Sequence, residues 1–397
     1  MVRVTWTVRP LGADDAEASR QLGFEAFGIP AETPSEPARF DTPGRHSFGA
    51  YADGTLAARL SDREFDSWFG GVTLPTAGIA GVTVAAEHRG RGALTPLFDT
   101  MLRAAKDRGA VLSTLFPTAS RIYRRFGYEV VAELATVSVP TATLASTRPT
   151  PSTTTRRATE ADVPAVRAVY EAWALEQNGP LTRRGPSFPA TAADYLAGFT
   201  GVTVAEDSTG IVGYVSWGRG PGYGDSARLA VTDLVARTPE AHRALLAVLG
   251  SFASVTPTTR IDTSGDDLAR LFIPSLHWQV EHASPYMLKV LDVPLALSAR
   301  RYPPGFTADL SFAVAGDVLA ENNASYVLRV ADGSGDCEPG ADTDRTLTPA
   351  GLALLYAGAQ SGANLRSAGQ LTGGRVDDDL VWDALFGGRQ RHIRNYF

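Results

Sequence analysis

The alternation of hydrophobic and polar residues predicts mixed strands and helices over the first third of the chain. The segment TWTVRPL from Thr5 indicates a strand, and ADDAEASRQLGFEAFG has the spacing of an amphipathic helix with an aspartate cap. The segment HSFGAYADGTLAARLS indicates two strands joined by a tight turn at Asp53-Gly54. Elements in this order predict an α+β (mixed α/β) domain.

Further along, a strand, a loop with two arginines and two glycines, and a helix follow one another. AGIAGVTVAA predicts the strand, and hydrophobic residues then recur at helical spacing, so that one helix face packs on the sheet; these are Leu94, Leu97, Phe98, Met101 and Leu102. The strand AVLSTLF, a short helix around SRIYRRFG and the strand YEVVAELATVSV complete the domain.

The pattern restarts after the Ser/Thr/Pro linker STRPTPSTTT. RRATEADVPAVRAVYEAW echoes RPLGADDAEASRQL, with Asp162 in the place of Asp15, and VTVAEDSTGIVGYVSW echoes the hairpin, which indicates an internal duplication. The second copy lacks the glycines of the Arg/Gly loop, so we expect it to be structural. A third region begins around LKVLDVPLALSARRYPPG. The predicted domains are residues 1–145, 152–288 and 289–397.

Composition narrows the class of protein. A chain of 397 residues with 44% hydrophobic and 20% charged residues is expected to form two or three globular domains. The net charge of -6 argues against a nucleic-acid or membrane-surface protein and favours cationic substrates. The single Cys337 excludes an intrachain disulfide, and the histidine spacings predict no metal site. No signal peptide or membrane-spanning run is recognised, so we expect a cytoplasmic location.

The Arg/Gly loop predicts an anion site. At a helix N-terminus the unpaired amides and the helix dipole favour negative charge. Gly90 and Gly92 allow close backbone approach, and Arg89 and Arg91 can add charge-assisted hydrogen bonds, a combination suited to a pyrophosphate. A simple solvated turn is the alternative. Walker-type and dinucleotide loops fit poorly, because GKS/T is absent and the glycine spacing is wrong.

The run VTVAAEHRGRGAL resembles the coenzyme A pyrophosphate loop of the GNAT acetyltransferases, R/Q-x-x-G-x-G/A, with Leu94 departing from the final small residue. Together with RIYRRFGYE, the second GNAT-like copy and a sterol-carrier-like C-terminal region, the whole chain resembles the Eis family of N-acetyltransferases. The resemblance implies tandem GNAT-like domains followed by a sterol-carrier-protein-like domain. It also implies transfer of acetyl groups from acetyl-CoA to several amines of a polycation such as an aminoglycoside, and hence antibiotic resistance, in a homohexamer.

The resemblance also assigns site residues. Cofactor contacts would come from Val82, Val84, Arg89, Gly90, Arg91, Gly92, Ala93, Leu94 and Thr118. Tyr123 would be the general acid, although its spacing with Ile122 and Phe126 alone favours a core aromatic. The C-terminal carboxylate, here on Phe397, would be the general base.

A wide, acidic cleft is expected for the acceptor, with Glu25 and Phe27 as candidates for binding a substrate ammonium group. A solvated helix carboxylate is the alternative for Glu25. Two other functions stay open: acetylation of protein lysines or polyamines, and a non-enzymatic carrier of hydrophobic ligands. The intact loop argues against the carrier, which would have no use for it.

Overall fold

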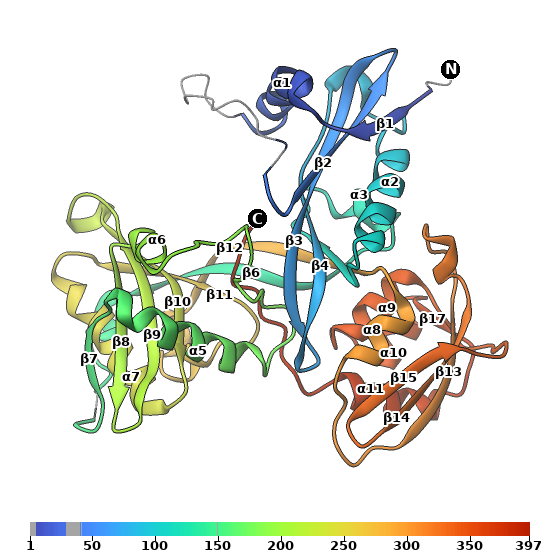
Figure 1. Ribbon diagram of the computed structural model, residues 1–397. Coiled ribbons are helices and arrows are strands. Elements are labelled where there is room, and N and C mark those ends of the chain that lie inside the picture. Colours follow the sequence, from blue (N-terminus) through green and yellow to red (C-terminus); the bar gives the residue numbers. More distant parts are fainter. Residues whose placement is uncertain (1–4, 29–39, 41, 149) are drawn as a thin grey trace.

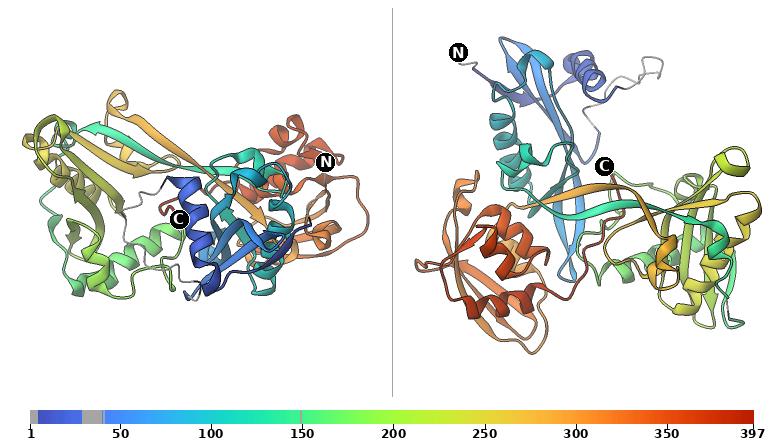
Figure 2. Two further views of the ribbon diagram at one scale, coloured as in Figure 1. Left: turned by 90° about the horizontal axis from the view of Figure 1, so that it is seen from above. Right: turned by 180° about the vertical axis from the view of Figure 1, so that it is seen from behind.

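The computed structural model describes residues 5–28, 40, 42–148 and 150–397, which form three parts (Figure 1). The first part, blue to cyan, and the second, green to yellow, share a large sheet. The third part, orange to red, packs below the first. The C-terminus lies near the middle, where the parts meet (Figures 1 and 2).

The first part contains β1 (Thr7–Pro10), α1 (Ala16–Phe27), β2 (Arg45–Ala52), β3 (Thr55–Phe69), β4 (Val72–Val84), α2 (Leu94–Asp107), β5 (Leu112–Leu115), α3 (Ser120–Arg124), β6 (Glu129–Pro140) and α4 (Thr141–Leu144). The predicted hairpin turn is confirmed, because Asp53 (φ 48°) and Gly54 (φ 81°) are both left-handed, as a two-residue type I′ turn requires. The predicted apolar face of α2 is also confirmed: all five of its residues are buried.

The second part contains β7 (Thr154–Arg157), α5 (Val163–Ala174), α6 (Ala192–Ala197), β8 (Gly201–Asp207), β9 (Gly210–Arg219), β10 (Arg228–Ala236), α7 (Pro239–Gly250), β11 (Thr258–Thr263) and β12 (Gln279–Val290). The duplication is visible in matched ion pairs. Arg9 contacts Asp15 at 2.7 Å, and Arg156 contacts Asp162 at the same distance and sequence spacing. Each aspartate also accepts a backbone N–H three residues earlier, at the turn that starts the helix.

A continuous twelve-stranded sheet of the described residues joins the two copies, in the order β1-β2-β3-β4-β5-β12-β6-β11-β10-β9-β8-β7. Strand β12, from the second copy, enters between β5 and β6 of the first, and β6 in turn pairs with β11. The long strands β6 and β12 therefore run across both copies (Figure 2). The domain bounds expected from the sequence stay a prediction.

The third part contains α8 (Val293–Ala299), β13 (Ala308–Val314), β14 (Ser325–Ala331), β15 (Ser334–Pro339), β16 (Thr346–Leu347), α9 (Pro349–Tyr356), α10 (Gly362–Ser367), β17 (Leu371–Thr372) and α11 (Asp379–Phe386). Its sheet has the order β15-β14-β13-β16-β17. Its core is continuous with that of the first part, since Phe69 and Leu74 pack into the same buried cluster. A buried ion pair between Lys289 and Asp317 (2.6 Å) ties the third part to β12.

Candidate active site

The strands β4 and β5 separate in the middle of the first part. They pair in parallel from Thr76 to Ile79, and β4 then continues alone on that side as far as Val84. A bulge at Gly81 (φ 62°) interrupts the pairing of β4 with β3 at the same level. In the described sheet, the β5-facing backbone groups of Val82 and its neighbours have no strand partner. They are therefore accessible to a bound ligand, although the Val84 carbonyl accepts a hydrogen bond from Arg89 Nε at 3.3 Å.

The start of α2, just beyond β4, has the properties of an anion site. Gly90 (φ 73°) and Gly92 (φ 86°) are left-handed, and a Cβ built on either would meet no atom within 4 Å. Within residues 42–148, the amides of Gly90, Gly92, Ala93 and Leu94 donate no hydrogen bond to another backbone group, and no side chain caps the helix. The site therefore offers several donors and open space to an anion.

The second copy differs at the equivalent place. Helix α7 starts with Thr238, whose hydroxyl accepts the amide hydrogen of Ala241 at 3.1 Å, and Pro239 occupies its first position. A side chain thus already satisfies a donor that a bound phosphate would need. That the second copy is structural stays a prediction.

Other predicted residues surround the loop. The Glu25 carboxylate, on α1, accepts the Ala86 amide hydrogen at 2.8 Å and lies 3.7 Å from Arg89. These contacts connect α1 to the loop and stabilise it. The Arg91 backbone carbonyl accepts the indole N–H of Trp6 at 3.3 Å. Phe27, at the end of α1, is half exposed. The Glu25 carboxylate therefore already has two partners in the loop. Binding of a substrate ammonium group by Glu25 and Phe27 stays a prediction.

Tyr123 lies on the short helix α3 and is 5% exposed. Its ring packs edge-on against Phe98 with centroids 5.9 Å apart, so the core position expected from its spacing is real. Burial, with a smaller contribution from Tyr396, raises the pKa of the phenol to about 12. Tyr123 is therefore protonated at neutral pH and can donate a proton. Thr118 lies exposed in the turn before α3, and its cofactor contact stays a prediction.

The segment after α11 leaves the third part and crosses the second. The Asn178 amide hydrogen is accepted by Gln390 O (2.8 Å), and that of His392 by Asn178 O (2.9 Å). Arg394 and Asp267 form an ion pair at 2.8 Å with both side chains buried. Ile393 N donates to Ser264 Oγ at 2.8 Å. These contacts fix the path of the chain end.

The chain end reaches the point where β4 and β5 separate. The Phe397 ring lies 4.9 Å from that of Phe65 and 5.4 Å from that of Phe116, measured between centroids. Gly78, one residue before the β4–β5 pairing ends, leaves room for both the Phe65 and Phe397 rings. The Tyr396 ring packs at a tilt against that of Phe116, with centroids 4.4 Å apart, and Tyr396 influences the Tyr123 phenol. The residue before Phe397 thus lies close enough to Tyr123 to influence its phenol, although the two are far apart in sequence.

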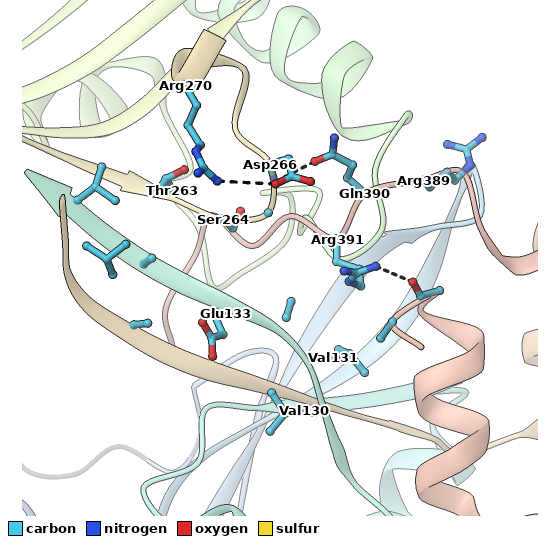
Figure 3. A pocket seen from close by; sticks show the side chains of 18 of the residues that line it. Val130, Val131, Glu133, Thr263, Ser264, Asp266, Arg270, Arg389, Gln390 and Arg391 are labelled. Carbon is cyan, nitrogen blue, oxygen red and sulfur yellow. Dashed lines mark hydrogen bonds and ion pairs between the residues drawn. The ribbon is translucent and has the colours of Figure 1, made fainter. Parts of the chain in front are cut away.

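The sequence carried no indication of these aromatic neighbours or of the buried tail contacts, because each joins residues more than a hundred positions apart. A cavity of about 750 Å³ lies elsewhere, between β6, β12 and the tail (Figure 3). There Arg270 points toward Asp266 at 3.7 Å, and Glu133 faces in from β6. None of the predicted site residues lines this cavity.

Among the residues that the structure describes, no cluster of three potential metal ligands occurs. Across the same residues, every helix is too short or too polar to cross a membrane.

Comparison with known families and proteins agrees with this architecture. Residues 7–131 and 179–290 each match a family model described as an acetyltransferase (GNAT) domain, and residues 293–394 match a sterol carrier protein domain. The crystal structure of a GCN5-related N-acetyltransferase from Kribbella flavida superposes with a TM-score of 0.84 at 29% identity, covering 100% of this chain and 99% of that chain.

Two curated relatives identify the family. An uncharacterized N-acetyltransferase of Streptomyces griseus is 30% identical over 403 residues, covering 96% of either chain. The N-acetyltransferase Eis of Mycobacterium tuberculosis (strain H37Ra) is 27% identical over 312 residues, covering 76% of this chain and 75% of Eis. The chain thus belongs to the Eis family of GNAT N-acetyltransferases, with two GNAT domains followed by a sterol-carrier-protein-like domain.

Proposed function

We propose that the protein transfers the acetyl group of acetyl-CoA to a primary amine in the first GNAT domain, between the α2 loop and Phe397. The observation that carries this proposal is the uncapped start of α2, where left-handed Gly90 and Gly92 leave amides and open space for the pyrophosphate. Because α7 is capped by Thr238, only the first copy is expected to bind acetyl-CoA.

In this reaction the amine nitrogen attacks the thioester carbonyl carbon, and a C–N bond forms as the C–S bond breaks. Backbone N–H groups of β4 around Val82 and Val84 are suited to stabilise negative charge on the carbonyl oxygen. Tyr123 donates its phenolic proton to the departing thiolate, which leaves as CoA thiol. The raised pKa of Tyr123 keeps that proton available at neutral pH. The surplus proton of the amine passes to a base, and solvent returns it to the tyrosine.

Provided that Phe397 ends the mature chain, we assign the base to its α-carboxylate. Its ring is held by Phe65 and Phe116, and the buried Arg394–Asp267 pair anchors the preceding segment. The described part of the chain contains no cation within ion-pair distance of this terminal carboxylate, so its lone pairs remain able to accept a proton.

The finer details rest on the resemblance to Eis. They are a polycationic acceptor such as an aminoglycoside, acetylation at several amines, a hexameric assembly and a cytoplasmic location. Protein lysines and polyamines are alternative acceptors. Analytical ultracentrifugation of the purified protein tests the hexamer.

Release of CoA thiol from acetyl-CoA, measured with a panel of amines, tests the proposed activity. The panel contains kanamycin, spermidine, a lysine peptide and 4-aminobutyramide, with mass spectrometry of the acetylated product. We expect amine-dependent thiol release matched by an N-acetylated product. Binding of a hydrophobic ligand together with no thiol release from any amine would instead support the carrier function.

A further inference from the structure

Three arginines lie on one face of the hairpin formed by β2 and β3. Arg59 and Arg63 lie on β3, and Arg45 on β2 is paired directly with Arg63. Ala58 and Leu60, on either side of Arg59 in β3, pack into the core beneath α2. Because side chains alternate across a strand, the arginines point to the opposite face, where α1 lies.

This is also the face on which the chain ends. Gly78 on β4 is paired with Arg63, and a Cβ at Gly78 would approach the Phe397 ring to 3.0 Å. Arg59 is paired with Thr83, next to the β4 backbone assigned above to the acetyl carbonyl. Neighbouring strands lie about 5 Å apart. An acceptor whose amine reaches the terminal carboxylate must therefore lie beside these arginines.

Among the residues that the structure describes, these arginines have no counter-charge. Within the described residues, no carboxylate forms an ion pair with Arg45, Arg59 or Arg63, in contrast to Arg108, which pairs with Asp62 on the α2 side of the same strand. Arg45 donates to Ser61 Oγ at 3.2 Å. All three arginines are half-buried. Arg63 also lies over the Phe65 ring, 5.5 Å from its centroid. Half-buried guanidinium groups without a counter-charge, two of them directly opposed, repel one another, and a bound anion would reduce this repulsion.

Neighbouring groups strengthen the preference for an anion. Arg59 Nε and Thr83 Oγ1 are buried and have no hydrogen-bond partner among the described residues. Burial and the nearby Arg45 lower the pKa of Arg59 and of Arg63. A carboxylate or phosphate placed here would accept hydrogen bonds from the guanidinium groups and reduce their mutual repulsion.

We propose that Arg45, Arg59 and Arg63 bind a carboxylate or phosphate group carried by the acceptor amine. This proposal rests on the acetyltransferase function proposed above and narrows its substrate class to amines that carry an anionic group. It differs from the polycationic acceptor and the acidic cleft that the resemblance implies, because a polycation would be repelled by this face.

Matched acceptors test the proposal in the wild-type protein. 4-Aminobutyrate is compared with 4-aminobutyramide, and glucosamine 6-phosphate with glucosamine, by CoA thiol release. We expect the anionic member of at least one pair to have a kcat/KM about 10- to 100-fold higher, the usual effect of charge-assisted hydrogen bonds. A higher value for 4-aminobutyrate indicates a carboxylate site, and a higher value for glucosamine 6-phosphate indicates a phosphate site. Equal values within both pairs, or a preference for kanamycin, would overturn the proposal.

Single substitutions test whether these arginines cause the preference for the anionic acceptor. Arg63→Gln and Arg59→Gln should remove most of the advantage of the anionic acceptor, so that the ratio of its kcat/KM to that of its neutral partner falls toward one. Arg243→Gln, which changes a partly exposed arginine on α7, is the matched control and should leave the advantage of the anionic acceptor unchanged. A loss of acetyl-CoA affinity in Arg63→Gln would show that the arginines serve the cosubstrate and would refute the acceptor assignment. If a variant does not fold, the comparison of anionic and neutral acceptors in the wild-type protein still tests the proposal.

The two proposals can fail separately. If CoA thiol is released equally with neutral and anionic amines, the acetyltransferase function is supported and the anion site is refuted. If no amine is acetylated, the proposed function fails, and calorimetry with 4-aminobutyrate and glucosamine 6-phosphate then decides on the anion site. Binding that is lost in Arg63→Gln supports the site, and no binding of either compound to the wild-type protein refutes it.

Discussion

Replacing Gly92 by alanine tests the phosphate site at the start of α2. The residue has a φ of 86°, and a left-handed conformation costs a residue with a Cβ about 1–2 kcal/mol. A Cβ at this position would meet no protein atom within 4 Å, so no steric clash adds to that cost. We therefore expect Gly92→Ala to fold, with a free energy of unfolding lowered by about 1–2 kcal/mol.

The effect on cosubstrate binding should be larger than the effect on folding. The added methyl group would occupy the space through which a pyrophosphate reaches the amides around Gly92. Losing one hydrogen bond to a charged group costs about 1.5–3 kcal/mol. Since about 1.4 kcal/mol corresponds to a factor of ten, the Kd of acetyl-CoA should rise about 10- to 100-fold.

Gly109→Ala is the matched control. Gly109 follows α2 at its other end, has a φ of 91°, and likewise has no atom within 4 Å of a built Cβ. The conformational cost is thus the same, but the position is remote from the loop. Thermal unfolding should show similar losses in the two variants, whereas calorimetry should show weaker acetyl-CoA binding in Gly92→Ala alone. An unchanged Kd in Gly92→Ala would refute the phosphate assignment.

Tyr123→Phe should lower kcat by about 10² to 10⁴, the usual contribution of a positioned proton donor, with little change in acetyl-CoA affinity. Tyr128→Phe, which removes a buried hydroxyl bonded to Ser113 at 2.6 Å, should cost about 1 kcal/mol of stability and little kcat; equal kcat losses would make Tyr123 a packing residue. A semisynthetic amide at Phe397 should lose most turnover relative to the free acid, and full kcat in the amide would exclude the carboxylate as base. Burial and the nearby Arg394 lower the pKa of His392 to about 4, below its usual 6.5, so the unfolded chain binds the extra proton between these values. The free energy of unfolding should then fall by up to about 3 kcal/mol as the pH drops from about 6.5 to 4. Urea titrations should show a flatter pH dependence for His392→Gln, and an unchanged one would contradict this assignment.

Local features were predictable from the sequence because their causes lie within a few residues. The apolar face of α2 follows from helical periodicity, and the turn at Asp53-Gly54 from the need for two left-handed residues. The open start of α2 follows from Gly90 and Gly92 together with the absence of a capping side chain. The duplication was also readable, since Asp15 and Asp162 are each paired with an arginine six residues earlier.

Only the tertiary structure decided which distant segments meet. Periodicity specifies which face of a strand is buried but not which strand pairs with it, so the entry of β12 between β5 and β6 could not be predicted. The same holds for the path of the tail, which depends on buried contacts such as that between Arg394 and Asp267. Arg59 and Arg63 lie on one face of β3, but the pairing of Arg63 with Arg45 and the arrival of Phe397 on that face required the folded chain. The proposed site would join Tyr123 to the chain end at Phe397, and such a site depends on long-range packing, which no local pattern records.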